Sequence, residues 1–444
     1  MKRIIGRLKL VAQFIYTSIG FYPTLLSLLF FGIAVLMIYF ETRGISKSLE
    51  DELPFFIISH GETANMILSS IATGIFSLIA FGFTMVMLVL NQASANFSPR
   101  VIPGLITSKS NQKVLGLFLG TLIYTLVVMV NVRSEHYDTD LPGLAVFLAM
   151  CFTILCLAFF VYFIHSISTA IQIGSILEDT YKLTLDKLRR ELAQDEGKEL
   201  QAIFKTGSWQ LLDSSRSGYL QKIDRNAVIE LCREQDVVLE FLQPLGHFVI
   251  KGLPFARVSG QLKDEEAFCN ELDTQLSFYQ EELADVNYLY GFKQITESAV
   301  KALSPSINDP GTAIKAIDYL TDLLIVRMPL TDEKIFHDKE HVLRLRLDEV
   351  SYQDLLSLCL GPIRVYGRED PVILMRLLNL VKNLFLAAKS YPNRQSSITK
   401  EAQLIVADAD DFVKNEGDRQ KINQMLDSLN DTCGLDQTLP KLQA

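Results

Sequence analysis

Charged side chains are missing from three long stretches in the first 180 residues. No Asp, Glu, Lys or Arg lies between Glu62 and Arg100, between Lys113 and Arg133, or between Asp140 and Glu178. Uncharged apolar runs of this length match the hydrocarbon thickness of a bilayer. Ion-coupled transporters and voltage sensors normally carry ionisable groups within their spans. The absence of such groups argues against both of these protein classes.

Catalytic and metal-binding signatures are also missing. The six cysteines form no CxxC pair, and the chain has no HExxH motif, no GxxxxGK motif and no local Ser/His/Asp signature. Reduced, structural thiols are therefore expected, without a disulfide framework or zinc site. We predict no catalytic residue, no cofactor and no metal site.

Acidic groups outnumber basic groups in the second part of the chain. Residues 178–444 carry 32 basic and 43 acidic groups, a net charge of −11. Such an acidic segment is a poor partner for nucleic acid or anionic lipid headgroups. We therefore expect no nucleic-acid partner.

Apolar residues dominate the N-terminal part, and 49% of all residues are hydrophobic. Four membrane-spanning helices are predicted, at 21–40, 66–90, 114–132 and 142–166. The first is too long for a signal-peptide core and has no Ala-x-Ala exit, so it is expected to stay as an anchor. The predicted fold class is a multi-pass α-helical membrane protein with four transmembrane helices and a mixed α+β cytosolic domain.

The charges of the short connections predict the orientation. The segment before the first span and the second loop are basic, whereas the first and third loops are acidic. Basic connections stay inside, so both termini are expected in the cytoplasm, in a bacterial inner membrane. Residues 1–20, which place bases among Ile, Leu and Val, are expected to form either an interfacial helix or a plain flank of the first span.

A stripe of small and polar residues follows one side of the second span. Its members are spaced by three and four residues, which is helical spacing. Either it allows close helix packing, because small residues let membrane helices approach, or it faces a water-filled path. The stripe comprises Ser70, Thr73, Ser77, Ala80, Thr84 and Asn91.

Two polar residues mark the predicted membrane exit of the fourth span, in FIHSISTAIQ. They are His165 and Gln172. An interfacial His with a local hydrogen bond and a titratable functional His are both compatible with this position.

The remaining chain, after a transmembrane domain at 21–177, is predicted to form three parts. A connecting helix is expected at 178–205, a small β domain at 206–262 and a helical domain at 263–444. WQLLDSSRSGYLQKID reads as two strands around a turn, and PLGHFVIKGLPFARV is similar to a half-repeat of the barrel-sandwich hybrid. This predicts a small β-barrel or sandwich. The helical domain is expected to be helical from about 264 through LSFYQEEL, with a β-hairpin inserted near 335–348.

The segment ALSPSINDPGTA, residues 302–313, joins two helical patterns. Asp before Pro is typical of a helix start. The Asp side chain caps the first turn, and the missing N–H of Pro costs no hydrogen bond there, because the first N–H groups of a helix have no partner within it. An interface or a ligand or ion site is the alternative for Pro305, Asn308, Asp309, Pro310 and Thr312. The stretch around Asp370-Pro371 has a similar order of helix, loop and helix, which indicates a weak internal repeat of helical pairs.

The four spans, FSPRVI, SGYLQKID, PLGHFVIKGLPFARV and YGFKQITESAVKALSPSINDPGTA together resemble a bacterial family of predicted membrane proteins with a domain of unknown function. Members of this family often have Gly at the position of Ser306 and an aromatic residue at the position of Gly311. This chain differs from the family pattern at both positions. The resemblance implies a membrane location, and it implies no particular reaction.

Three functions follow in order of preference. The first is a homo-oligomeric channel for ions or small solutes, gated by the cytosolic domain. The second is a membrane-anchored sensor or scaffold that binds a cytosolic ligand, and the third is a membrane-bound enzyme. The expected partners are the lipid bilayer, further copies of the chain and a small ion or cytosolic ligand.

Overall fold

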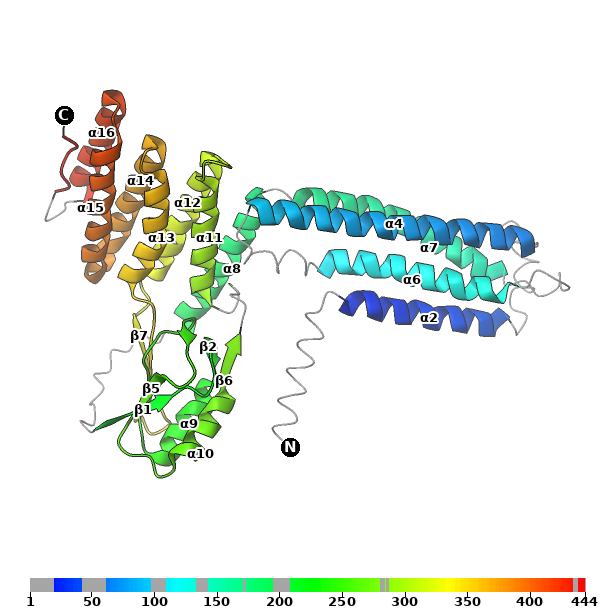
Figure 1. Ribbon diagram of the computed structural model, residues 1–444, viewed down its shortest axis with the longest axis horizontal. Helices are drawn as coiled ribbons and strands as arrows, with labels where there is room; N and C mark the ends of the chain where they lie inside the picture. The colour runs from blue at the N-terminus through cyan, green and yellow to red at the C-terminus, as the bar shows by residue number, and fades with distance from the viewer. Residues whose placement is uncertain are drawn as a thin grey trace. The chain divides into compact units, whose positions relative to one another are not determined.

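The computed structural model describes residues 20–41, 61–96, 109–132, 143–170, 173–194, 208–279, 284, 287–433 and 438–443. The chain divides into two compact units (Figure 1). We call residues 1–95 and 101–175 the apolar unit, and residues 96–100 and 176–444 the C-terminal unit. The expected helix at 1–20 lies outside the described residues.

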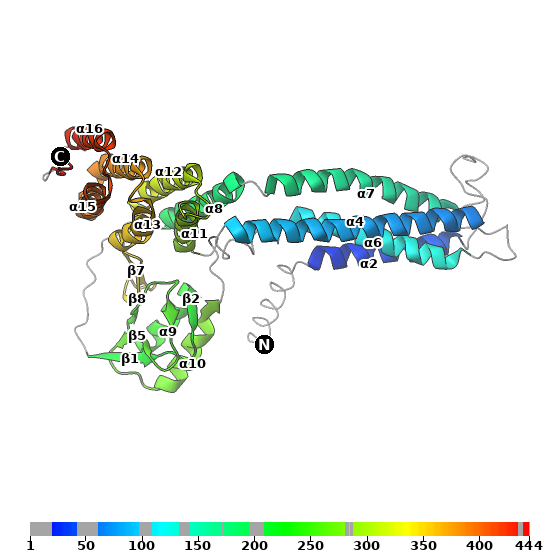
Figure 2. The same cartoon turned by 45° about the horizontal axis from the view of Figure 1, so that its top comes forward.

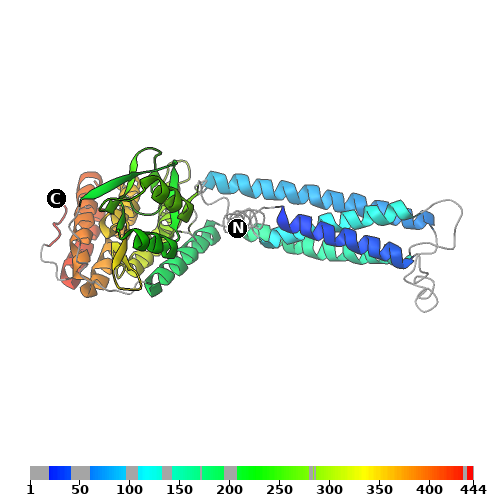
Figure 3. The same cartoon turned by 90° about the horizontal axis from the view of Figure 1, so that it is seen from below.

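Four long helices form the apolar unit and run alongside one another (Figure 3). Each corresponds to one of the predicted spans, and the ends of the helices lie up to six residues from the predicted limits. They are α2 (Phe21–Glu41), α4 (Gly61–Asn96), α6 (Lys109–Asn131) and α7 (Gly143–Ala170).

Small residues bring α6 against α2. A Cβ at Gly116 would lie 2.7 Å from Cδ1 of Leu26, and one at Gly120 would lie 2.8 Å from Cγ of Phe30. Two glycines four residues apart place both close contacts on one face of α6. On this helix, therefore, small residues serve helix packing.

Five described helices, rather than four, are long and apolar enough to cross a membrane. The fifth covers Pro371–Ser390, which comprises α14 (Pro371–Ala387) and the short 3-10 helix after it, and it belongs to the C-terminal unit. Its Leu377, Leu380 and Leu384 are buried in the core of that unit. The predicted count of four spans is thus not confirmed by length and composition.

The main part of the C-terminal unit begins within α8 (Ile173–Gln194) and continues into two β-sheets. Helices α9 (Arg225–Gln235) and α10 (Glu265–Gln275) contribute Val228, Cys232 and Phe268 to the core beneath the sheets. The five-stranded sheet has the order β1 (Trp209–Asp213), β5 (Pro254–Ser259), β3 (Leu239–Phe241), β8 (Leu343–Asp348) and β7 (Glu333–His337). The three-stranded sheet has the order β4 (Phe248–Val249), β2 (Gly218–Ile223) and β6 (Leu276–Tyr279).

Among the described residues the predicted barrel does not form, because β1 and β7 are the edges of an open sheet. Alternation and glycine turns are common to barrels and open sheets, and here helices cover the apolar face. The two strands of WQLLDSSRSGYLQKID exist but pair in different sheets. The hairpin near 335–348 forms as β7 and β8, and β8 also pairs with β3 in parallel.

One segment predicted as helix is a strand. Leu276–Tyr279 pairs with β2 as β6, so the helical pattern from residue 264 ends at Gln275. Leu276 is buried in the β core. A four-residue run is too short for its periodicity to separate strand from helix.

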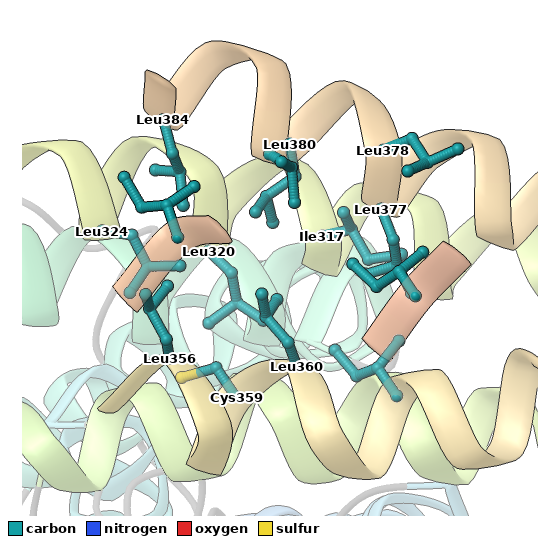
Figure 4. Packing of buried hydrophobic residues seen from close by; sticks show 14 of the residues in the cluster. Ile317, Leu320, Leu324, Leu356, Cys359, Leu360, Leu377, Leu378, Leu380 and Leu384 are labelled. Carbon is teal, nitrogen blue, oxygen red and sulfur yellow. The ribbon is translucent and has the colours of Figure 1, made fainter. Parts of the chain in front are cut away.

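Six helices form three successive pairs beyond the sheets (Figure 2). Helices α12, α14 and α16 contact one another in one row, and α11, α13 and α15 in a second row. The leucines between these rows form one core (Figure 4). The helices are α11 (Tyr288–Ala302), α12 (Pro310–Arg327), α13 (Tyr352–Gly367), α14, α15 (Gln395–Phe412) and α16 (Glu416–Cys433), and two short 3-10 helices, η1 (Ala388–Ser390) and η2 (Pro392–Arg394), connect α14 to α15.

Candidate functional site

The two faces of α4 differ in chemistry. The buried face is apolar and contributes Ala64, Leu68, Ile71, Ile75 and Ile79 to the core of the apolar unit. At 3.6 residues per turn, the predicted stripe spans about 80° of arc on the opposite side. Its members, Ser70, Thr73, Ser77, Ala80, Thr84 and Asn91, are all exposed in the described structure.

Hydroxyl groups of the stripe bond to their own helix. Ser70 donates to the carbonyl of Met66, Ser77 to that of Thr73 and Thr84 to that of Ala80. These bonds satisfy the donors and leave lone pairs free on the hydroxyl oxygens. Gly74, beside the stripe, has no atom within 4 Å of the place of a Cβ. The stripe therefore offers weakly polar oxygen atoms and space for a close approach.

Of the two polar residues at the predicted membrane exit, the structure describes only one. His165 is exposed near the end of α7. Gln172 lies outside the described residues.

The ALSPSINDPGTA segment is a compact corner between α11 and α12. Asp309 caps α12, because its Oδ1 accepts from the Thr312 N–H at 3.1 Å, and its Oδ2 accepts from the Thr312 hydroxyl at 2.5 Å. Pro310 occupies the first helical turn, and Pro305 is exposed. The backbone N–H of Asp309 donates to the Ala302 carbonyl at 2.8 Å. Both carboxylate oxygens thus serve the start of the helix.

Asn308 has a backbone φ of 48°, in the left-handed region. Asn tolerates this region better than most residues, because its short polar side chain crowds the backbone little. Its side chain is exposed, and no described residue bonds to it. The corner therefore needs Asn308 for its backbone, while its amide group faces solvent.

A second corner of the same kind joins α13 and α14. Asp370 accepts from the Val372 N–H at 2.8 Å and from the Ile373 N–H at 3.4 Å. A Cβ at Gly367 would lie 3.4 Å from Cδ1 of Leu303, so the two corners are neighbours. The third pair has a different corner, in which Asn415 accepts from the Asp418 N–H at 3.2 Å.

A buried charged cluster joins the helices to the sheet. Arg327 and Arg394 both bind the Asp332 carboxylate, at 3.2 and 2.6 Å, and both donate to the Leu330 carbonyl, at 2.7 and 2.6 Å. Arg327 also donates to the Tyr288 hydroxyl at 3.2 Å. We call these residues the junction cluster. It fixes the turn between α12 and β7, and sequence patterns did not reveal it.

Lys334 on β7 links this hairpin to α8. Its ammonium group lies 2.8 Å from both Glu191 and Glu349. Burial alone would lower the pKa of Lys334, but the two carboxylates outweigh it and raise the pKa. Burial would raise the pKa of Glu191, but Lys334 and Lys187 outweigh it and lower the pKa. Both groups are therefore held in their charged forms.

Helix α8 is bound firmly into the C-terminal unit. The Tyr181 hydroxyl donates to Asp322 at 2.6 Å, and the Tyr181 ring stacks on Tyr319 at 4.4 Å. Burial, followed by the bond to Asp322, raises the pKa of Tyr181 to about 12. Gly291 of α11 lets α8 approach, because a Cβ there would overlap Thr184 and lie 2.8 Å from its Cβ.

Two buried thiols of the C-terminal unit, Cys232 and Cys359, are poor nucleophiles. Burial raises the pKa of Cys232 and of Cys359 to about 12 in each case. Since the thiolate is the reactive form, these groups are inert near neutral pH. Within the described ranges, no group of three His, Cys, Asp or Glu residues has the arrangement of a metal site.

Long apolar helices in one unit, together with a mixed α/β C-terminal unit that has cores of its own, are typical of a membrane protein. The chain belongs to the family described as "Predicted membrane protein (DUF2254)", whose model matches residues 16–383. This confirms the family resemblance seen in the sequence, and the family description names no reaction.

Two mycobacterial relatives are similar over most of their length. Uncharacterized proteins of Mycobacterium bovis and of Mycobacterium tuberculosis are each 26% identical over 389 residues, which is 85% of this chain and 74% of the relative. No solved structure matches the chain.

Proposed function

We propose that the protein is a homo-oligomer of the bacterial inner membrane that passes small ions or solutes. In this proposal the α4 helices of neighbouring copies meet along the stripe of Ser70, Thr73, Ser77, Ala80, Thr84 and Asn91. The C-terminal unit lies in the cytoplasm and gates the path through α8.

The proposal rests mainly on the direction of the stripe. Helix α4 buries an aliphatic side, and on its exposed side the small, weakly polar stripe runs between large apolar residues such as Phe76 and Phe81. A second copy of the chain would cover this side, since small residues favour close helix contact. Where hydroxyl oxygens line the gap between copies, they can replace part of the hydration shell of a small ion.

The attachment of α8 supports a gating role for the C-terminal unit. Helix α8 follows α7 in sequence, with only residues 171–172 between them, and its contacts with Asp322, Gly291 and Lys334 fix it to that unit. A displacement of the C-terminal unit would therefore be transmitted to α7.

A sensor or scaffold is the second candidate, and the helix pairs favour it. Stacked helix pairs form extended surfaces that commonly bind other molecules. This role needs no conduction, so an electrical measurement separates it from the first candidate.

The test is a planar-bilayer recording of the purified full-length chain. We expect a conductance that falls at least about tenfold in Ser77→Leu and in Thr84→Leu, because a bulky apolar side chain would dewet the path. Ile154→Leu, on the exposed side of α7, is the matched control and should conduct as the unaltered chain does. Equal currents in all variants would remove the stripe from the path, and no current at all would favour the sensor or scaffold.

A further inference from the structure

A rigid turn projects from the three-stranded sheet at residues 250–253. The Leu253 N–H donates to the Ile250 carbonyl at 3.2 Å, and Gly252 has a φ of 77°. The turn is tied to the connection between β1 and β2, because Gly252 N–H donates to Ser214 O at 2.8 Å and Lys251 N–H donates to Ser217 Oγ at 2.9 Å. Its shape is thus fixed by backbone bonds.

Three apolar side chains on and beside this turn are exposed. Phe248, Ile250 and Leu253 are 51%, 50% and 51% exposed. Val249 between them is buried, so Phe248 and Ile250 point together to the opposite, outer side, as alternate residues of a strand do. Tyr219 supports Phe248 with an edge contact between ring centroids 5.1 Å apart. We call residues 248–253 the apolar tip.

The charge around the apolar tip differs from that of the rest of the C-terminal unit. Residues 241–263 contain no Asp or Glu but contain Lys251, Arg257 and Lys263, of which Arg257 is paired with Glu240 at 2.8 Å. Lys251 stands in the turn itself and is exposed. Asp213, opposite Pro254 in the β1–β5 pair, is an acidic neighbour on the adjoining strand. An otherwise acidic unit therefore presents an apolar tip with one exposed base, Lys251.

The exposed apolar area of the tip indicates whether a protein or a lipid surface binds there. Three half-exposed side chains offer on the order of 300 Å², whereas a stable protein interface needs about 800 Å² from each partner. A lipid surface needs only a few inserted side chains and a nearby base. The apolar helices keep the chain at a bilayer, so a lipid surface is always available at high effective concentration.

We propose that the apolar tip docks on the bilayer surface, with Phe248, Ile250 and Leu253 inserted at the headgroup boundary and Lys251 against lipid phosphates. Such docking would give the C-terminal unit a second, reversible attachment to the membrane besides α8. This inference is independent of the proposed conduction, which assigns no role to the tip.

The experiment uses the full-length chain in lipid nanodiscs. Trp209 is the single tryptophan, so Trp209→Phe gives a silent background for Leu253→Trp. Val342→Trp, on the β7–β8 turn of the same unit and 37% exposed in the unaltered chain, is the matched control. Thermal unfolding of each variant first establishes that it folds like the background. Emission is then compared between ordinary lipids and lipids with brominated acyl chains.

We expect brominated lipids to quench Leu253→Trp at least about twofold more than Val342→Trp, because the tip reaches about 5–10 Å into the interface. Adding Lys251→Glu should reduce this quenching in phosphatidylglycerol nanodiscs more than in phosphatidylcholine nanodiscs. Equal quenching at both positions would overturn the proposal. So would emission at Leu253→Trp that changes with protein concentration and not with bromine, which would identify a second protein copy as the occupant.

Discussion

At the residue scale, the Asp-Pro corners follow local rules. Asp309 and Asp370 each cap the helix that begins with the next residue. The sequence alone predicts this geometry, because the cap and its partners lie within three residues of one another. A site for an ion or ligand at Asp309 stays a prediction, although the Thr312 N–H and hydroxyl already bind both oxygens.

We expect Asp309→Ala to lower the free energy of unfolding by about 1 kcal/mol, because the first turn of α12 loses its cap. Asp309→Asn, which keeps a capping oxygen, is the matched control and should lose clearly less. Thermal unfolding of the purified chain, followed by circular dichroism, measures both. If the folded Asp309→Ala protein also loses its assembly state, the corner has a role between subunits as well.

The junction cluster shows where residue-level reasoning stops. Arg327 ends an apolar helix and Arg394 follows a Tyr-Pro-Asn turn, so each looks like an ordinary terminal base. Their common partner, Asp332, is 62 residues away from Arg394 in sequence. Only the packing of α12, η2 and β7 brings them together, and no local pattern reports that packing.

At the scale of elements, close approach explains how α8 is held. Gly291 stands where α8 crosses α11, opposite Thr184. A Gly within a helix usually lowers its stability, so its presence here has a packing reason. The helices themselves were predictable from apolar periodicity. The crossing was not predictable, since nothing in the sequence marks which Gly faces which helix.

We expect Gly291→Ala to destabilise the C-terminal unit by about 1–3 kcal/mol, because the added methyl group forces α8 and α11 apart. Gly361→Ala, inside α13 with open space at the Cβ position, should be neutral or stabilise by about 0.5–1 kcal/mol. Thermal unfolding compares the two. Equal effects in both variants would show that the contact between α8 and α11 is loose.

The strands show the same limit at this scale. The hairpin of β7 and β8 was predictable because its partners are close in sequence. The parallel pairing of β8 with β3, more than 100 residues earlier, was not predictable. This long-range pairing turns an expected insertion in a helical domain into part of a five-stranded sheet.

At the scale of the whole molecule, the family establishes a membrane protein. Composition predicted that class correctly, because uncharged apolar runs of bilayer length are typical of membrane-spanning helices. Composition was less decisive about the number of spans, since α14 is also long and apolar enough to cross a membrane yet contributes to the core of the C-terminal unit. In the described part of the chain, the stripe of α4 is exposed.

The most direct test of the central claim is the chemical accessibility of the stripe in a bilayer. Ser77→Cys is placed in a chain whose six native cysteines are replaced, and Phe76→Cys, at nearly the same depth and 65% exposed in the unaltered chain, is its control. A charged, membrane-impermeant thiol reagent is added while conductance is recorded. Our account predicts rapid labelling and loss of current for Ser77→Cys and neither for Phe76→Cys. Protection of both positions, with unchanged current, would contradict it, because a stripe without water cannot line a path.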